Sequence, residues 1–489
     1  MKTIKYLSIA FALMLGISAC ELPDNVDPKR PTEVPISTLF TNAQVALVNQ
    51  VNDVNVNRNM IRLIAQYWQE TTYFDEARYN FQDRKIPDNY TAEFYRDVLM
   101  DFKEAKKKLN DPDYGGDAVE KTNMLSIITI LEVYAWQCVF DAFGDMPYSQ
   151  ALMGAENSTP VYDDAATVYD DLLARISAAI DGLVMMVGDE EAGSFGAADL
   201  MYGGNPAAWK KFGASLKLRL GMRLADVSPT KAQAAVEQAV SAGVFTSQDE
   251  SGYLFYIGVV PHVNAIYNAY FVDNRKDYLP TNTIIDLMLA LDDPRLPLYF
   301  TEYEGEYVGA IAGLDGAQSY YNYSHFQDRF FEATFEAIMA DYVEVEFLLA
   351  EAVERGFAVG GTAEGHYNAA IEASILYWEG SDTDVADYLA LPDVGYGTAP
   401  GNYKQKIGTQ KWIALYNRGI EGWTEWRRLD YPELNPPEHM VYSDIPKRLP
   451  YPYDEIAQNG TNYYAAVAKM GGTDDHRQPV FWDIVAPPF

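Results

Sequence analysis

Residues 205–224 read NPAAWKKFGASLKLRLGMRL and are marked at their start as a helix. Asn205 supplies a capping side chain directly before Pro206. Proline is favoured at the first helical position because its missing N–H would have no partner there. The same two signals recur at Ser228 and Pro229, so the sequence predicts successive helices in this part of the chain.

Apolar residues recur at three- and four-residue steps through most of residues 38–430, which is the spacing of one face of a helix. One such stripe consists of Phe94, Val98, Phe102, Ala105 and Leu109. Patterns typical of strands are few and short. We therefore predict an all-α fold.

Residues 124–143 are apolar enough to raise the question of a membrane span. Glu132, Gln137 and Asp141 interrupt this stretch and fall on more than one helix face. We predict a buried core helix instead.

Prolines recur from Pro432 to Pro452 and break any long helix there, so we expect the tail after Asp430 to wrap the helical body. Stretches rich in glycine and tyrosine at about 300–332 and 380–402 are expected to form long loops. Long loops in compact domains often carry function.

The N-terminus reads as a secretory signal. Lys2 and Lys5 are followed by an uncharged apolar run that is too short to span a bilayer comfortably. The run ends in Ile17-Ser18-Ala19-Cys20, which resembles the bacterial lipobox. We expect residues 1–19 to be a lipoprotein signal peptide and Cys20 to be lipidated, with several acyl chains such as palmitate giving a stable anchor. The alternative is an apolar run that ends in cysteine by chance.

Residues 20–37 lack apolar periodicity, and we expect a lipidated tether there, followed by a single domain over residues 38–489. Glu21, Asp24 and Asp27 follow the cysteine closely. This arrangement resembles the surface-export signal of Bacteroidetes lipoproteins, which implies an outer-membrane protein facing the cell exterior. A plain polar linker facing the periplasm is the alternative.

The chain has 489 residues, of which 37 are Lys or Arg and 70 are Asp or Glu, for a formal net charge of −33. This charge argues against a nucleic-acid partner, since phosphate backbones are bound by clusters of basic residues. The one basic run, Lys106-Lys107-Lys108, lies in an otherwise mixed segment. Once Cys20 is acylated, Cys138 is the remaining cysteine, so no intrachain disulfide is expected.

No catalytic motif is found in the sequence. The five histidines include no His-Glu-x-x-His pair, and one remaining thiol excludes the common cysteine zinc sites, so we predict no metal site and no cofactor. A glycosidase carboxylate pair needs proximity in space only, so the sequence leaves that possibility open. Arg219 and Arg223 share one helix face, and Glu344 and Glu351 share another. We expect a buried ion-pair network that joins these two helices.

Several segments together resemble the SusD/RagB family of outer-membrane nutrient-binding lipoproteins, over nearly the whole length. The matching segments, in the order of the family, are Phe143-Gly144-Asp145-Met146-Pro147-Tyr148-Ser149, the 205–224 helix, Asp293-Pro294-Arg295-Leu296, the segment from Glu344 to Ala352, Gln410-Lys411-Trp412, Glu425-Trp426-Arg427-Arg428, the segment from Ile445 to Pro452, and Phe481-Trp482-Asp483.

The resemblance implies a SusD-like fold, in which helix pairs pack like tetratricopeptide repeats and long irregular loops cover one side. The sequence itself has no tetratricopeptide consensus. The resemblance also implies a non-enzymatic lipoprotein that captures oligosaccharides or peptides at the cell surface. Such proteins pass their ligand to a SusC-type TonB-dependent transporter for nutrient uptake.

The chain contains 36 tyrosines, and rigid amphipathic rings suit contact with sugar faces or peptide side chains. Tyrosines in polar loops are better ligand candidates than those on helix stripes. The predicted ligand-binding aromatics lie in two regions and are Trp68, Tyr73, Phe74 and Tyr79 in the first, and Tyr303, Tyr307, Tyr320, Tyr321 and Tyr323 in the second. The polar residues expected to add hydrogen bonds are Asp75, Arg78, Asn322 and Asp328.

Two other classes of function remain open from the sequence. One is a surface-anchored glycan hydrolase, and the other is a structural or adhesive lipoprotein. The sequence does not distinguish a glycan ligand from a peptide ligand, because tyrosine-rich loops serve both.

Overall fold

The computed structural model describes residues 33–314 and 319–484. In this part the chain is mainly helical and has three two-stranded sheets, so the predicted all-α class is confirmed. The signal peptide, Cys20 and most of the tether lie outside the described residues. The first helix in the described part of the chain, α2, begins at Ile36, slightly before the predicted domain boundary at residue 38.

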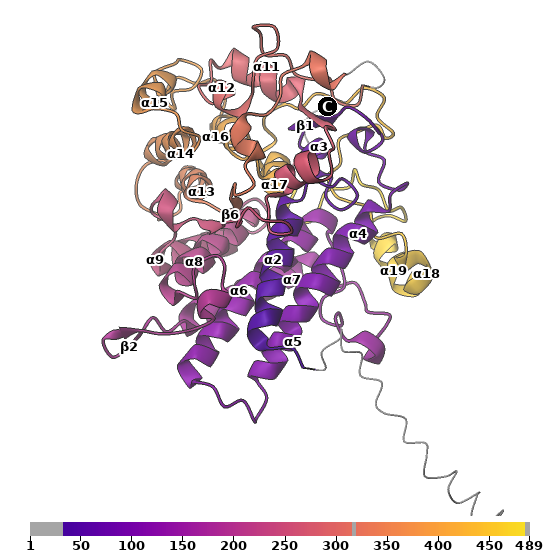
Figure 1. Ribbon diagram of the computed structural model, residues 1–489, viewed down its shortest axis with the longest axis vertical. Coiled ribbons are helices and arrows are strands. Elements are labelled where there is room, and N and C mark those ends of the chain that lie inside the picture. The colour runs from indigo at the N-terminus through magenta and orange to yellow at the C-terminus, as the bar shows by residue number, and fades with distance from the viewer. Residues whose placement is uncertain (1–32, 315–318, 485–489) are drawn as a thin grey trace, which may run out of the picture.

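Pairs of consecutive helices make up the body of the molecule (Figure 1). The pairs that contact each other most are α6 (Ala118–Phe143) with α7 (Ala165–Gly182), α8 (Pro206–Arg223) with α9 (Pro229–Ala242), and α13 (Tyr342–Glu354) with α14 (Ala363–Tyr377). Helix α2 (Ile36–Asn52) packs against α5 (Met100–Leu109) and the π-helical turn before it, η2 (Glu93–Leu99). Helix pairs thus follow one another as the family resemblance implies.

Helix α6 lies in the lower half of Figure 1, with α2, α5 and α7. It is long and apolar enough to cross a membrane, but most of its apolar stretch is buried within the protein. Glu132 of this helix pairs with Lys106 and Arg175 from its neighbours, which explains how a carboxylate is accommodated on it. The predicted core helix is therefore confirmed.

The upper part in Figure 1 contains short elements and long connections. The further helices outside the C-terminal tail are α3 (Ile61–Ile64), α4 (Ile86–Ala92), α10 (Ala265–Tyr267), α11 (Asn282–Ala290), α12 (Leu296–Tyr299), α15 (Asp382–Leu389), α16 (Tyr403–Ala414) and α17 (Gly419–Leu429). The strands of the molecule are β1 (Trp68–Glu70), β2 (Met186–Val187), β3 (Glu190–Glu191), β4 (Gly252–Leu254), β5 (Tyr278–Pro280) and β6 (Ala337–Ala340). The antiparallel pairs are β1 with β5, β2 with β3, and β4 with β6.

The predicted long loop at 300–332 is confirmed, since the described residues between α12 and β6 contain only short 3-10 turns. The second predicted loop, 380–402, is wrong in part because α15 lies within it. Ser381 caps this helix through a reciprocal capping box with Asp384. A short polar helix of this kind has too few apolar residues to show a clear period.

The tail after Asp430 packs onto the helical body, as predicted. The indole nitrogen of Trp482 donates to Asp141 of α6 at 2.8 Å, and Arg448 Nε donates to the carbonyl of Phe143 at 3.0 Å. The tail also contains two helices that the prolines did not predict, α18 (Glu455–Gln458) and α19 (Gly460–Lys469).

A buried ion-pair network joins the central helices. Arg219 of α8 binds Glu344 of α13 through two hydrogen bonds of 2.5 and 2.7 Å. Burial acts to raise the pKa of Glu344, but Arg219 and Arg418 hold that pKa below its ordinary value. The predicted network between α8 and α13 is therefore present.

The network extends to helix α17, which was not expected. Arg223 pairs with Glu421 and Glu425 of α17 instead of Glu351. Glu351 in turn pairs with Arg428, also from α17, at 2.5 Å. The charge balance of the core is thus shared by α8, α13 and α17, with Asp141 of α6 and Lys411 of α16 as further partners.

Candidate functional site

The two predicted aromatic regions lie side by side. Strand β1 carries the start of the first region and pairs with β5, with Trp68 opposite Pro280. The backbone N–H of Gly313, in the second region, donates to Gln69 Oε1 at 2.8 Å. Arg78 Nε donates to the carbonyl of the same glycine at 2.8 Å. The fold therefore brings together segments about 240 residues apart.

Trp68 and Tyr79 lie inside the protein. Trp68 is 2% exposed, and its ring contacts Tyr278 and Phe326 at 5.2 and 4.9 Å between ring centroids. Tyr79 has no exposed surface. A ring without an exposed face has no surface for stacking on a ligand. Trp68 and Tyr79 were predicted to bind ligand, but their burial indicates that they support the neighbouring exposed residues instead.

Tyr73 is 63% exposed and stands out from the surface. Its backbone is left-handed, with φ of +61°, which is uncommon for a bulky residue and costs free energy. The guanidinium of Arg84 lies 5.4 Å from the ring centroid, and Arg84 is itself held by Glu76 and by Asn57 at 3.1 Å. The surrounding residues therefore fix an exposed ring in a strained conformation.

Tyr320 and Tyr321 form a second exposed group. Tyr321 is 69% exposed, and its ring meets Tyr320 edge-on at 5.5 Å. Tyr320 is half-buried, which raises the pKa of its hydroxyl to about 12, so the phenol remains protonated at neutral pH. Its ring stacks on His325 at 4.1 Å. Tyr321 is thus an exposed ring that packs against Tyr320, which is in turn held by His325.

The segment 276–277 links the two exposed groups. Lys276 Nζ lies 5.8 Å from the Tyr320 ring, and the backbone carbonyl of Lys276 accepts from Thr71 Oγ1 at 3.2 Å. Asp277 accepts from Thr72 Oγ1 at 3.2 Å. We refer to Tyr73, Lys276, Tyr320 and Tyr321 below as the tyrosine surface.

The other predicted aromatics, Phe74, Tyr303, Tyr307 and Tyr323, are half-buried. Tyr307 packs against the hydrophobic core. The polar residues Asp75, Asn322 and Asp328 are exposed, and Arg78 is half-buried. Whether any of these residues contacts a ligand stays a prediction.

A family model described as starch-binding and associating with the outer membrane matches residues 28–452. That match covers most of the chain. The chain belongs to the SusD-like family.

Solved SusD-like structures agree with this membership. A chitin-binding protein is 26% identical, with a TM-score of 0.76, over 92% of this chain and 100% of that chain. A SusD homologue from Bacteroides thetaiotaomicron is 25% identical, with a TM-score of 0.76, over 93% of this chain and 100% of its own. A homologue from Bacteroides ovatus is 26% identical, with a TM-score of 0.76, over 92% of this chain and 99% of its own. No curated protein matches the chain.

Three side chains that contact the tyrosine surface were missed by the sequence reasoning, namely Arg84, Lys276 and His325. Each touches a tyrosine of the surface through its side chain. Arg84 and Lys276 each stand beside a second basic residue, Lys85 and Arg275, in polar stretches without apolar periodicity, so no local pattern marks them as partners of a tyrosine. Their role follows from tertiary contacts alone.

Two carboxylates lie beneath the tyrosine surface. Burial, with a further contribution from Glu76, raises the pKa of Glu70 well above its ordinary value. Glu70 Oε2 accepts from the backbone N–H of Ala77 at 3.2 Å. The side chains of Glu70 and Glu76 are both buried. They support the turn that carries Tyr73. Among residues 33–314 and 319–484, no group of three or more metal-ligating side chains is present.

Proposed function

We propose that this SusD-like protein is a non-catalytic, lipid-anchored protein of the outer membrane that captures oligosaccharides at the cell surface. In this proposal it passes them to a SusC-type TonB-dependent transporter. The observation that carries the proposal is the tyrosine surface, where the exposed rings of Tyr73 and Tyr321 come from distant segments that residues 276–277 connect, in a member of a family described as starch-binding.

Oligosaccharides are the proposed ligand for two reasons. The family description names starch, and a relative of solved structure is described as a chitin-binding protein. A sugar ring presents apolar C–H faces and polar edges, which suits an open tyrosine ring beside a lysine ammonium group. The lipid anchor, the outward orientation and the transporter partner rest on the lipobox resemblance and on the family.

The binding test uses the purified full-length protein in a detergent without a sugar headgroup. It is titrated with neutral oligosaccharides, anionic polysaccharides and peptide mixtures, and products are analysed in parallel. Saturable binding of one oligosaccharide, recovered intact, is the expected result. Cleaved product would establish the hydrolase alternative, and binding of peptides alone would contradict the proposed ligand class.

Tyr321→Ala and Tyr73→Ala test whether the tyrosine surface is the binding site. Truncation of an aromatic anchor costs roughly 1–2 kcal/mol, so we expect about five- to thirtyfold weaker binding. Tyr464→Ala is the matched control, since Tyr464 is 59% exposed and lies on α19, outside this surface. Unchanged affinity in both site variants would remove the tyrosine surface from the proposal.

A further inference from the structure

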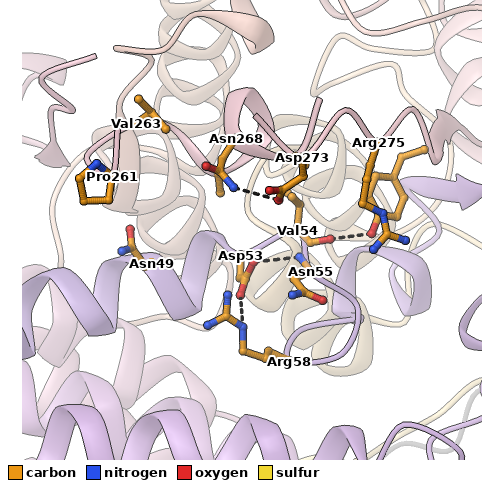
Figure 2. Close-up of a pocket in the computed structure, with 13 residues that line it drawn as sticks. Asn49, Asp53, Val54, Asn55, Arg58, Pro261, Val263, Asn268, Asp273 and Arg275 are labelled. Carbon is orange, nitrogen blue, oxygen red and sulfur yellow. Dashed lines mark hydrogen bonds and ion pairs between the residues drawn. The ribbon is translucent and has the colours of Figure 1, made fainter. Parts of the chain in front are cut away.

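A cavity of about 290 Å³ opens where the end of α2 faces the segment 261–278 (Figure 2). One wall comes from α2 and the turn after it, and the other comes from the segment around α10. This volume is at the lower end of the range for small-molecule sites. The cavity is lined by none of the residues of the tyrosine surface.

The α2 side of the cavity offers unused hydrogen-bond donors. Asn49 Oδ1 accepts from the Tyr256 hydroxyl at 3.1 Å, and Asn55 Oδ1 accepts from Asn57 at 2.9 Å. The amide nitrogens of Asn49 and Asn55 have no hydrogen-bond partner among the described residues. Both side chains are exposed at the cavity.

The opposite side adds acceptors and a further donor group. Asn268 Nδ2 donates to Asp273 Oδ2 at 3.0 Å, as Figure 2 shows. Arg275 Nε donates to Asp277 at 2.6 Å, which leaves its two terminal nitrogens without a partner among the described residues. Donors and acceptors thus face the same space. Hydroxyl groups both donate and accept, so a polyhydroxylated ligand matches this lining.

The charge around the cavity disfavours anions. Arg58 is paired with Asp53 at 2.9 Å and with Glu93 at 3.3 Å. Arg275 is paired with Asp277 at 2.6 Å, and Asp273 also lines the cavity. The lining holds two carboxylates, Asp53 and Asp273, and two guanidinium groups, so the cavity has no excess of positive charge, and the whole chain carries a net charge of −33.

The cavity also has an apolar wall. Pro261, Val263, Ala265 and Ala269 line it, and Val260 beside it is exposed. A pyranose ring has apolar faces formed by its C–H groups, so such a wall matches one face of a single sugar residue.

We infer that this cavity is a second binding site, which takes one uncharged monosaccharide residue. The inference rests on the proposed function, because it names a further contact for the same class of ligand. The two sites lie on either side of residues 275–276, since Arg275 lines the cavity and Lys276 faces Tyr320.

Saturation-transfer NMR on the full-length protein in detergent tests the inference. The probes are glucose, xylose, galactose and N-acetylglucosamine, with glucuronate as the anionic counterpart. We expect saturable binding of at least one neutral sugar and weaker binding of glucuronate. Tighter binding of glucuronate, or no saturable binding of any neutral sugar, would overturn the inference.

Two variants connect this binding to the cavity. Asn49→Ala removes one free donor and is expected to weaken monosaccharide binding roughly three- to tenfold. Ala269→Phe fills the cavity and is expected to abolish binding. Asn42→Ala is the control, because Asn42 is exposed on the same face of α2, two turns earlier, and pairs with Asp101. Circular dichroism checks that each variant is folded.

The result is distinguishable from a failure of the proposed function. If Asn49→Ala and Ala269→Phe leave monosaccharide binding unchanged while Tyr321→Ala weakens oligosaccharide binding, the second site is ruled out and the tyrosine surface remains the binding site. If the cavity variants abolish monosaccharide binding while Tyr73→Ala and Tyr321→Ala change nothing, the cavity stands and the tyrosine surface fails.

Discussion

Arg223 is fully buried, and its charge is balanced by residues of two other helices. Its guanidinium contacts Asp141 of α6 at 3.3 Å, and it pairs with Glu421 and Glu425 of α17. A charge removed from water needs such partners, because its desolvation alone costs several kcal/mol. The need for an arginine at position 223 therefore comes from carboxylates on helices that are distant in the sequence.

Arg223→Met tests this dependence. The substitution leaves buried carboxylates without one of their cations, so we expect the free energy of unfolding to fall by about 3–5 kcal/mol. Urea unfolding followed by circular dichroism measures the change. Arg96→Met is the control, since Arg96 is mostly exposed and pairs with Asp97, and its loss is expected to cost less than about 1 kcal/mol. Equal effects of the two substitutions would contradict the assigned role of Arg223.

At the residue level the sequence predicted that these arginines and glutamates form buried ion pairs, but it predicted only some of the pairings. It predicted that Arg219 and Arg223 would meet Glu344 and Glu351, and the pair Arg219 with Glu344 is correct. The remaining partners come from α17 and, for Arg223, also from Asp141 of α6. Glu421 and Glu425 lie four residues apart on one face of α17, but that spacing does not indicate which helix they meet. Pairing in space is set by packing, which periodicity along one helix does not encode.

At the element scale, helix starts were predicted well but their capping was not uniform. Asn205 caps α8 by accepting from the N–H groups of Ala207 and Ala208 at 2.9 and 3.2 Å. Ser228, at the equivalent position of α9, makes no side-chain capping bond. Proline at the first helical position marks both starts, whereas the cap itself depends on local backbone geometry.

The pair provides a matched prediction. Asn205→Ala is expected to lower the free energy of unfolding by about 1 kcal/mol, because two backbone N–H groups lose their acceptor. Ser228→Ala is expected to change it by only a few tenths of a kcal/mol, since no bond is lost. Chemical denaturation of both variants decides the point, and a larger effect at Ser228 would contradict it.

In the candidate site, the sequence did not predict which aromatic rings are buried and which are exposed. All three residues of β1 are buried, so the strand lacks the alternation that would separate an inward ring from an outward one. Trp68 was therefore predicted to contact ligand, although it is buried. Tyr73 and Tyr321, predicted for the same role, have exposed rings in polar segments, and their contact with a ligand stays a prediction.

At the scale of the whole molecule, the proposed function depends on an N-terminal tether that connects the folded domain to the membrane. Residues 20–35 connect the predicted lipidation site to the start of α2 at Ile36. A chain of this length keeps a folded body close to the membrane surface, and anchoring requires more than one acyl chain.

We expect protease added to whole cells to digest the protein, because the proposal places it on the outer face. We also expect Cys20→Ala to release it into the soluble fraction, since the acylated thiol is lost. Immunoblotting of protease-treated cells and of membrane and soluble fractions measures both. Full protection from protease would place the protein inside the cell envelope, and membrane retention of the Cys20→Ala variant would contradict the lipid anchor.

The buried charge network also has a consequence for the order in which the chain is made. Arg219 precedes its partner Glu344 by 125 residues, and Arg223 precedes Glu421 by 198. Synthesis at 5–20 residues per second separates Arg223 from Glu421 by roughly 10–40 s. During that interval Asp141 has been made but Glu421 and Glu425 have not, so the charge of Arg223 is only partly balanced and the native core closes when synthesis is nearly complete. A chain that completes its core this late has not closed into its native body while it is being made, and a chain that is not yet folded is the form that can be threaded across a membrane.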